Sequence, residues 1–264
     1  MDASSPILLF DSGVGGLSVL AELRAVLPQA PVIYAADMAG LPYGTKTEAQ
    51  VAARVAGLLG RMSERYRPRL ACIACNTAST IALGMVREVL EIPIVGTVPA
   101  IKPAAVVTRT GVIGLLGTEA TVRQRYVDEL EHAFAADKLL LRHAAPELVM
   151  LAEARLRGEP VPAGAVRGAL DRLLAHPRSA EIDTLVLACT HFPLLADELR
   201  EVFGPDVRLV DGAQGIARRI AALTEGQAFA RSEPDLAVTT GPLDSFRTLA
   251  PALRRYELER LARF

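Results

Sequence analysis

Two cysteines of this chain lie in closely similar sequence contexts. Cys75 follows the apolar run Leu70–Ala74 and Cys189 follows Thr184–Ala188, and each precedes small polar residues where a helix could begin. The N–H groups and the dipole at a helix N-terminus favour a thiolate. Two thiols on opposite sides of a carbon that bears an acidic proton can remove this proton from one face and return it on the other. The pair therefore predicts inversion of a stereocentre by acid–base catalysis.

The alternative for each cysteine is a buried thiol that packs as a small apolar side chain. We assign that role to Cys72, which lies inside the run Leu70–Ala74 among apolar neighbours. Cys72 and Cys75 form a C-x-x-C pair, but residues three apart on a strand point to opposite faces, so we expect no redox pair. Since the sequence has only three cysteines, a four-cysteine zinc site is excluded and we expect no metal.

Polar side chains beside the two cysteines could assist them. His191 is two residues after Cys189, where an imidazole could stabilise a thiolate or carry a proton. Asp11 ends the first apolar run and could orient an ammonium group or tune Cys75; the alternative is an N-cap for a helix that opens near Gly15. Groups suited to hydrogen-bond a carboxylate come from Asn76, Thr77 and Thr190.

Short β-rich runs alternate with amphipathic helical stretches, a pattern typical of parallel sheets with crossover helices. The runs predicted as strands are Ile7–Phe10, Val32–Ala36, Leu70–Ala74, Ile94–Thr97, Val112–Leu116, Leu139–His143, Thr184–Ala188 and Val207–Val210. The clearest predicted helices between them are Val19–Val26, Ala49–Tyr66 and Val122–Phe134. This pattern predicts an α/β fold.

The runs form two sets of four that resemble each other. The offset between matching landmarks is 106 residues for the first strand ends (11 to 117) and 114 for the cysteines (75 to 189), which favours internal duplication. We therefore expect two pseudo-symmetric domains, residues 1–97 with 211–264 and residues 98–210. The tail from Gln214 to Phe264 has a helical pattern and is expected to pack on the first domain. Because ligands bind beyond the carboxyl ends of parallel strands, we expect an active site in the interdomain cleft.

Composition narrows the class of protein. The chain has 264 residues, 51% hydrophobic and 22% charged, and its net charge of −1 gives no support to a nucleic-acid or membrane partner. No apolar run is long enough for a membrane span, and the N-terminus lacks the basic start of a signal peptide. Three cysteines are a small and odd number, which does not favour a disulfide framework. A cytoplasmic protein with free thiols is therefore expected.

Five segments together resemble glutamate racemase, of the aspartate/glutamate racemase superfamily. They occur in the expected order, and the resemblance runs from about Ile7 to Arg219; the segments are Asp11–Gly16, Pro42–Gly44, Ala74–Ser79, Val98–Ala104 and Cys189–Leu195. The resemblance implies a bacterial cytoplasmic enzyme that needs no pyridoxal phosphate or other cofactor and supplies D-glutamate for peptidoglycan.

The resemblance also implies roles for individual residues. Cys75 and Cys189 are the two acid/base residues, and Asp11, His191 and Glu153 assist them; from the residues alone, Glu153 resembles a solvated helix charge. The substrate is bound by Asp11, Ser12, Pro42, Tyr43, Gly44, Cys75, Asn76, Thr77, Thr118, Thr121, Cys189, Thr190 and His191. Glutamate is the implied partner, and the family pattern is compatible with a peptidoglycan-precursor activator and a homodimer.

Three other functions are consistent with parts of the sequence. An aspartate or hydantoin racemase would share the two-thiol chemistry and differ in its pocket. A nucleotide-binding dehydrogenase is suggested by Gly13-x-Gly15-Gly16 after a strand, but position 18 is Ser, where the dinucleotide motif requires glycine. A two-lobed amino-acid binder would use the same cleft without paired thiols.

Overall fold

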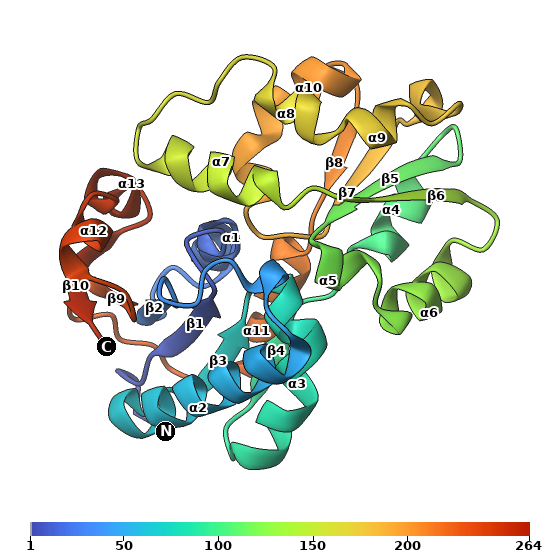
Figure 1. Ribbon diagram of the computed structural model, residues 1–264. Helices are drawn as coiled ribbons and strands as arrows, with labels where there is room; N and C mark the ends of the chain where they lie inside the picture. The colour runs from blue at the N-terminus through green and yellow to red at the C-terminus, as the bar shows by residue number, and fades with distance from the viewer. Residues whose placement is uncertain (1) are drawn as a thin grey trace. The chain divides into compact units, whose positions relative to one another are not determined.

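The computed structural model describes residues 2–264 and divides into two compact units (Figure 1). Unit 1 consists of Met1–Thr97 and Ala213–Phe264, and unit 2 consists of Val98–Gly212. The chain thus leaves unit 1 after its fourth strand and returns to it for its last segment. The second boundary lies slightly later in the chain than the one expected from the sequence.

Unit 1 contains a six-stranded, fully parallel sheet in the order β10-β9-β2-β1-β3-β4. Its strands are β1 (Ile7–Asp11), β2 (Val32–Ala36), β3 (Leu70–Ile73), β4 (Ile94–Gly96), β9 (Asp235–Thr239) and β10 (Leu258–Arg263). All residues of β1, β2 and β3 are buried, as expected for parallel strands that are covered by helices on both faces.

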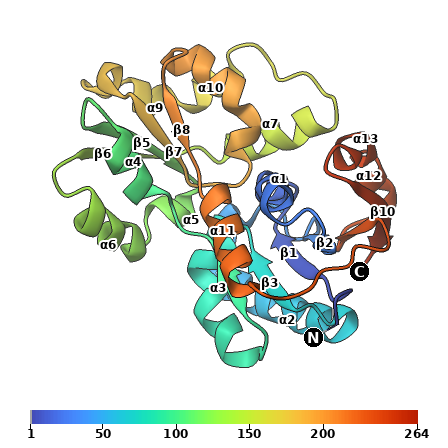
Figure 2. The same cartoon turned by 180° about the vertical axis from the view of Figure 1, so that it is seen from behind.

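Helices cover this sheet in two groups. One group pairs α1 (Leu17–Val26) with α11 (Ala213–Leu223), which lies in front of the sheet in Figure 2. The other pairs α2 (Glu48–Tyr66) with α3 (Asn76–Val89). The remaining helical segments of the unit are short: the 3₁₀ turn η1 (Tyr43–Thr45), α12 (Leu243–Arg247) and α13 (Ala250–Arg254).

Local sequence sets the ends of the long helix α2. Thr47 and Gln50 form a reciprocal capping box, in which each side chain accepts a hydrogen bond from the other's backbone N–H. The helix ends at Arg67, whose left-handed backbone closes the last turn. The apolar face of α2 packs with α3 and β1–β3 in one core cluster that includes Leu59 and Met62.

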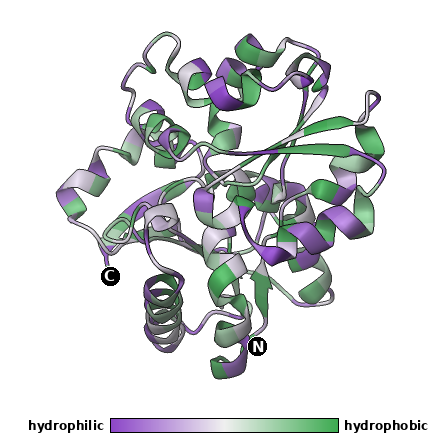
Figure 3. Ribbon diagram, turned by 45° about the vertical axis from the view of Figure 1, so that its right-hand side comes forward, coloured by the Kyte–Doolittle hydropathy of each residue, from purple (hydrophilic) through white to green (hydrophobic). Residues whose placement is uncertain are grey.

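Unit 2 contains a four-stranded parallel sheet in the order β6-β5-β7-β8. Its strands are β5 (Val112–Gly117), β6 (Leu139–Ala144), β7 (Thr184–Leu187) and β8 (Arg208–Val210). Its helical segments are α4 (Ile101–Val107), α5 (Glu119–Val122), α6 (Arg125–Phe134), α7 (Glu147–Leu156), α8 (Ala165–Ala169), α9 (Asp171–Leu174), η2 (Ser179–Glu181), η3 (Phe192–Leu195) and α10 (Ala196–Phe203). Figure 3 shows strands that are mostly hydrophobic and helices that carry both colours, as amphipathic helices do.

The two sheets repeat one topology. Four neighbouring strands of unit 1 have the order β2-β1-β3-β4, and the four strands of unit 2 have the corresponding order β6-β5-β7-β8. This match confirms the two similar α/β halves expected from the sequence. All eight predicted strands are present with small differences at their ends. Unit 1 differs by the two strands β9 and β10, which extend its sheet beyond β2.

Two secondary-structure predictions are wrong in part. The tail was expected to be helical, but it contains β9 and β10 besides its helices. β10 has the charged sequence Leu-Glu-Arg-Leu-Ala-Arg, and only pairing with β9 at the sheet edge makes it a strand. The helix expected over 122–134 is interrupted between α5 and α6. Among residues 2–264, no helix combines the length and the apolar character needed to cross a membrane.

Candidate active site

The thiol of Cys75 sits where β3 gives way to α3. Cys75 is the N-cap of α3, and its Sγ atom accepts a hydrogen bond from the backbone N–H of Ala78 at 3.5 Å. The thiol in turn can donate to Oγ of Ser12, 3.6 Å away. A donor at the sulfur and the N-terminus of a 14-residue helix both favour the thiolate. The sequence prediction that Cys75 stands at a helix start is confirmed.

Asp11 lies fully buried at the end of β1. Its Oδ2 atom accepts a hydrogen bond from the backbone N–H of Gly16 at 2.7 Å, which satisfies a donor at the start of α1. A side chain at position 16 would make tight contacts with Tyr34 and Ala74, which would have to shift to accept it. Asp11 therefore contacts the N-cap residue of α1, Gly16, but is not itself the N-cap that the sequence offered as one of its two alternatives.

The turn at Pro42 and Tyr43 is fixed by a buried carboxylate. Asp37, with no exposed surface, accepts a hydrogen bond from the Tyr43 hydroxyl at 2.5 Å and from Nη2 of Arg54 at 2.6 Å. The Nε atom of Arg54 and the hydroxyl of Thr240 also donate to it. Burial raises the pKa of Tyr43, and the negative charges of Asp37 and Cys75 raise it further, so this hydroxyl stays protonated.

Space for this turn depends on Gly40. A methyl group at position 40 would collide with Asp37, Arg54 and Tyr43. Pro42, which follows a cis peptide bond, and Gly44 are partly buried, whereas Tyr43 is buried. Gly40, Asp37 and Arg54 are therefore structural partners of the predicted Pro42–Gly44 turn.

In unit 2, three side chains form a chain of contacts. Nε2 of His191 lies 2.9 Å from Oε1 of Glu153, and Nδ1 of the same ring lies 3.9 Å from Sγ of Cys189. Glu153 has no exposed surface and His191 almost none. Nη2 of Arg157 lies 3.1 Å from the second oxygen of Glu153. The expectation of a solvated Glu153 is wrong, because its helix α7 turns this residue into the interior of the unit.

Cys189 differs from Cys75 in its local structure. The sequence suggested a helix start at both cysteines, but Cys189 is followed by Thr190, His191 and the 3₁₀ turn η3 before α10 begins. The proline at position 193 and a backbone bond from Phe192 N–H to Cys189 O accompany this tighter turn. In this half, an imidazole rather than an α-helix N-cap lies beside the sulfur.

The remaining predicted residues are all at strand or helix ends. Thr118 caps α5 through the backbone N–H of Thr121, and the two hydroxyls lie 3.1 Å apart. The hydroxyl and amide side chains among the residues predicted to bind substrate are all buried: Ser12, Asn76, Thr77, Thr118, Thr121 and Thr190. Unit 1 thus brings Asp11, Ser12, Tyr43 and Cys75 to one sheet edge, and unit 2 brings Glu153, Cys189 and His191 together.

Cys72 is the third free cysteine and lies wholly inside β3. Burial raises its pKa, and the charge of Asp11 raises it further, so it remains a neutral thiol. This environment agrees with the packing role that its apolar neighbours predicted.

Asp37, Arg54 and Arg157 are parts of the site that were not predicted from the sequence. Asp37 carried a usable signal, because it directly follows an apolar strand, much as Asp11 ends one. Arg54 and Arg157 carried none, since Arg54 lies on a helix with several charged residues and Arg157 is the charged residue just after α7.

Comparisons with known proteins all indicate the same family. The family model described as Asp/Glu/Hydantoin racemase matches residues 17–220. A glutamate racemase of Sphingopyxis alaskensis is 64% identical over 237 residues, which are 89% of this chain and 88% of that protein.

Solved structures agree with this family. Escherichia coli glutamate racemase in complex with L-glutamate and the activator UDP-MurNAc-ala superposes with a TM-score of 0.91 at 44% identity, over 98% of each chain. A glutamate racemase of Bacillus anthracis gives 0.84 at 29% identity, over 98% of this chain and 97% of that one. The family match, the similar sequences and the similar structures agree: the chain belongs to the Asp/Glu/Hydantoin racemase family.

Proposed function

We propose that this chain interconverts L- and D-glutamate by two-base proton transfer between cysteines, without a cofactor. The observation that carries the proposal is the equivalence of Cys75 and Cys189. They follow β3 and β7, which are the third strands of two sheets with the same order. The choice of glutamate is supported by the relatives, which are glutamate racemases at 64% and 44% identity.

In the proposed reaction the two cysteines act on opposite faces of the substrate α-carbon. The thiolate of one cysteine takes the α-proton, and the electron pair of the broken C–H bond remains on the substrate as a carbanion. The thiol of the other cysteine then gives its proton to the opposite face. Cys75 acts as base toward one enantiomer and Cys189 toward the other. The substrate gains and loses one proton, so no oxidant or reductant is needed.

The supporting groups have distinct proposed roles. Ala78 N–H stabilises the thiolate of Cys75, whereas the imidazole of His191, held by Glu153, does so for Cys189. Asp11 is proposed to assist proton transfer on the Cys75 side. Substrate carboxylates and ammonium are proposed to bind residues with small polar or backbone donors: Ser12, Pro42, Tyr43, Gly44, Asn76, Thr77, Thr118, Thr121 and Thr190.

The proposed biological role is to supply D-glutamate for peptidoglycan, which would place the enzyme in the cytoplasm with the precursors. The Escherichia coli relative was crystallised with the activator UDP-MurNAc-ala. We propose that the present chain also responds to a peptidoglycan precursor of this chemistry.

The test is circular dichroism of the purified chain with L-glutamate in D₂O, with no added cofactor. Loss of optical activity together with deuterium at the α-carbon would support the proposal. Activity on L-aspartate but not on L-glutamate would keep the two-thiol chemistry and overturn the substrate. Full retention of the α-proton with both substrates, also with the precursor present, would contradict a racemase function.

A further inference from the structure

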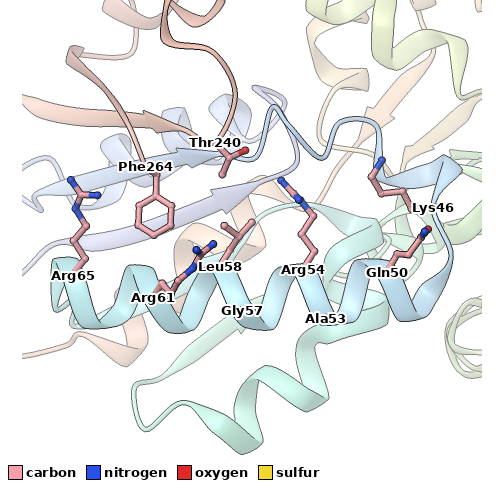
Figure 4. A pocket seen from close by; sticks show the side chains of 10 residues that line it. All are labelled: Lys46, Gln50, Ala53, Arg54, Gly57, Leu58, Arg61, Arg65, Thr240 and Phe264. Atoms are coloured by element: carbon pink, nitrogen blue, oxygen red, sulfur yellow. The ribbon is translucent and has the colours of Figure 1, made fainter.

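Unit 1 has an open cavity of about 1250 Å³ along one side of α2 (Figure 4). Four cationic side chains line it, Lys46, Arg54, Arg61 and Arg65, and of these Arg54 is ion-paired with Asp37. None of its ten lining side chains is acidic. Leu58 and the ring of Phe264 add an apolar wall. An excess of positive charge in a concave surface attracts anions.

The spacing of the arginines indicates the shape of the anion. Arg54, Arg61 and Arg65 lie on the same side of one continuous helix, as Figure 4 shows. The 11 residues from Arg54 to Arg65 correspond to about 16 Å along the axis at 1.5 Å per residue. A chain of linked phosphates covers more of this span than a single carboxylate or phosphate does, and guanidinium groups bind phosphate oxygens in pairs.

The two distal arginines are held in place. The guanidinium carbons of Arg61 and Arg65 lie 5.5 and 5.6 Å from the centre of the Phe264 ring. Between these arginines and Arg54, the small residue Gly57 leaves room, because a Cβ atom there would meet nothing within 4 Å. The cavity therefore has two cations that contact one aromatic ring, beside open space at Gly57.

Arg54 belongs both to this cavity and to the Tyr43 turn. Its guanidinium lines the cavity while Nε and Nη2 donate to Asp37, which accepts the hydroxyl of Tyr43. An anion that draws Arg54 toward the cavity weakens the hydrogen bonds between Arg54 and Asp37. Because Tyr43 is bonded to the same carboxylate, the change reaches the turn that is proposed to bind substrate.

We propose that this cavity binds a linear polyphosphate group, and that Arg54 couples its occupancy to the Tyr43 turn. The binding site stands independently of the catalytic assignment, whereas the coupling rests on the proposed racemase function. The two parts are therefore tested by separate measurements.

Binding is measured by titration calorimetry with tripolyphosphate at constant ionic strength. The expected result is one saturable site per chain. The double variant R61Q/R65Q should bind at least about tenfold more weakly, since each charged hydrogen bond contributes about that factor or more. R218Q/R219Q, which removes two exposed arginines of α11, should bind as the parent does. Equal weakening in both variants, or no saturable binding, would overturn the site.

A second pair of variants leaves every arginine in place. Gly57→Glu introduces a carboxylate into the cavity, and Gly57→Gln introduces a neutral side chain of the same size. Binding should be lost in G57E and largely retained in G57Q, with folding of each checked by thermal unfolding. Equal binding by both folded variants would contradict an anion site.

Coupling is measured as the KM for glutamate with and without saturating tripolyphosphate. We expect a saturable change in KM that is absent in G57E. Binding without any change in KM or kcat would overturn the coupling. Adenosine triphosphate serves as a second probe: tighter binding than tripolyphosphate would assign the Leu58–Phe264 wall to a base, and equal binding would identify the phosphate chain alone as the ligand. Either result supports the site.

Discussion

Nε2 of His191 lies 2.9 Å from Oε1 of Glu153, and both side chains are buried. The carboxylate thereby fixes the orientation of the imidazole, whose other nitrogen lies beside Sγ of Cys189. A carboxylate, an imidazole and a thiol in sequence can stabilise the charge that develops when the sulfur loses its proton. The same carboxylate also receives Arg157, so the network ends in a fixed positive charge.

We expect Glu153→Gln to lower kcat with a smaller effect on KM. The amide retains the shape of the side chain but removes the negative charge beside the His191 ring. A hydrogen bond to a charged group contributes about 1.5–3 kcal/mol, which corresponds to roughly a 10- to 150-fold loss in rate. The pH profile of kcat should shift as well. Glu147→Gln, an exposed change in the same helix, is the control; an equal loss in both variants would contradict the role of Glu153.

The three cysteines should respond differently to alanine. Cys75→Ala and Cys189→Ala each remove one of the two proposed bases and should lower kcat by at least about 10²-fold. Cys72→Ala should keep most of the activity and lower the free energy of unfolding by about 1 kcal/mol, as the loss of one small buried group does. Steady-state kinetics and urea denaturation measure these effects. Comparable loss of activity in all three variants would refute the assignment.

Gly40 and Gly60 should respond in opposite directions to alanine. At Gly40 the methyl group would collide with Asp37, Arg54 and Tyr43, so the variant should lose stability and bind glutamate more weakly. At Gly60, in the middle of α2, a methyl group meets nothing within 4 Å. Gly60→Ala should therefore raise the free energy of unfolding by roughly 0.5–1 kcal/mol. Thermal unfolding and KM measurements test both variants. Unchanged stability and unchanged KM in Gly40→Ala would argue against the crowded turn.

Asp183 should make unit 2 more stable above pH 4 than at lower pH. Burial acts to raise the pKa of this carboxyl, but hydrogen bonds from the Thr108 side chain and from the N–H groups of Arg109 and Thr110 lower it from 3.8 to about 2. A depressed pKa stabilises the fold above the unfolded-state value, and this stabilisation is lost as pH falls through the folded-state value.

The expected difference between the parent and Asp183→Asn is therefore largest above about pH 4 and shrinks toward pH 2. Urea midpoints over this range measure it. Asp206→Asn, an exposed change before β8, should show no such dependence. A difference that grows as the pH falls would have the wrong sign for this account.

Most of the fold was predictable because it depends on local patterns. Runs of four or five mostly apolar residues identify the eight strands of the two repeated sets, and their alternation with amphipathic stretches predicts parallel sheets. The exceptions lie where pairing overrides propensity. β10 is charged and becomes a strand through its contact with β9, a partner that the periodicity of the tail did not reveal.

By itself the sequence determined that Cys75 and Cys189 follow matching apolar strands of two similar halves, since this pattern depends only on neighbouring residues. Tertiary structure alone decided which charged side chains accompany them. Glu153 has the sequence setting of a surface residue, and Asp37 and Arg54 are 17 positions apart. Burial and hydrogen bonding turn these residues into partners of His191 and Tyr43, because a charged group inside a protein is stable only where the fold brings it an opposite charge or a donor.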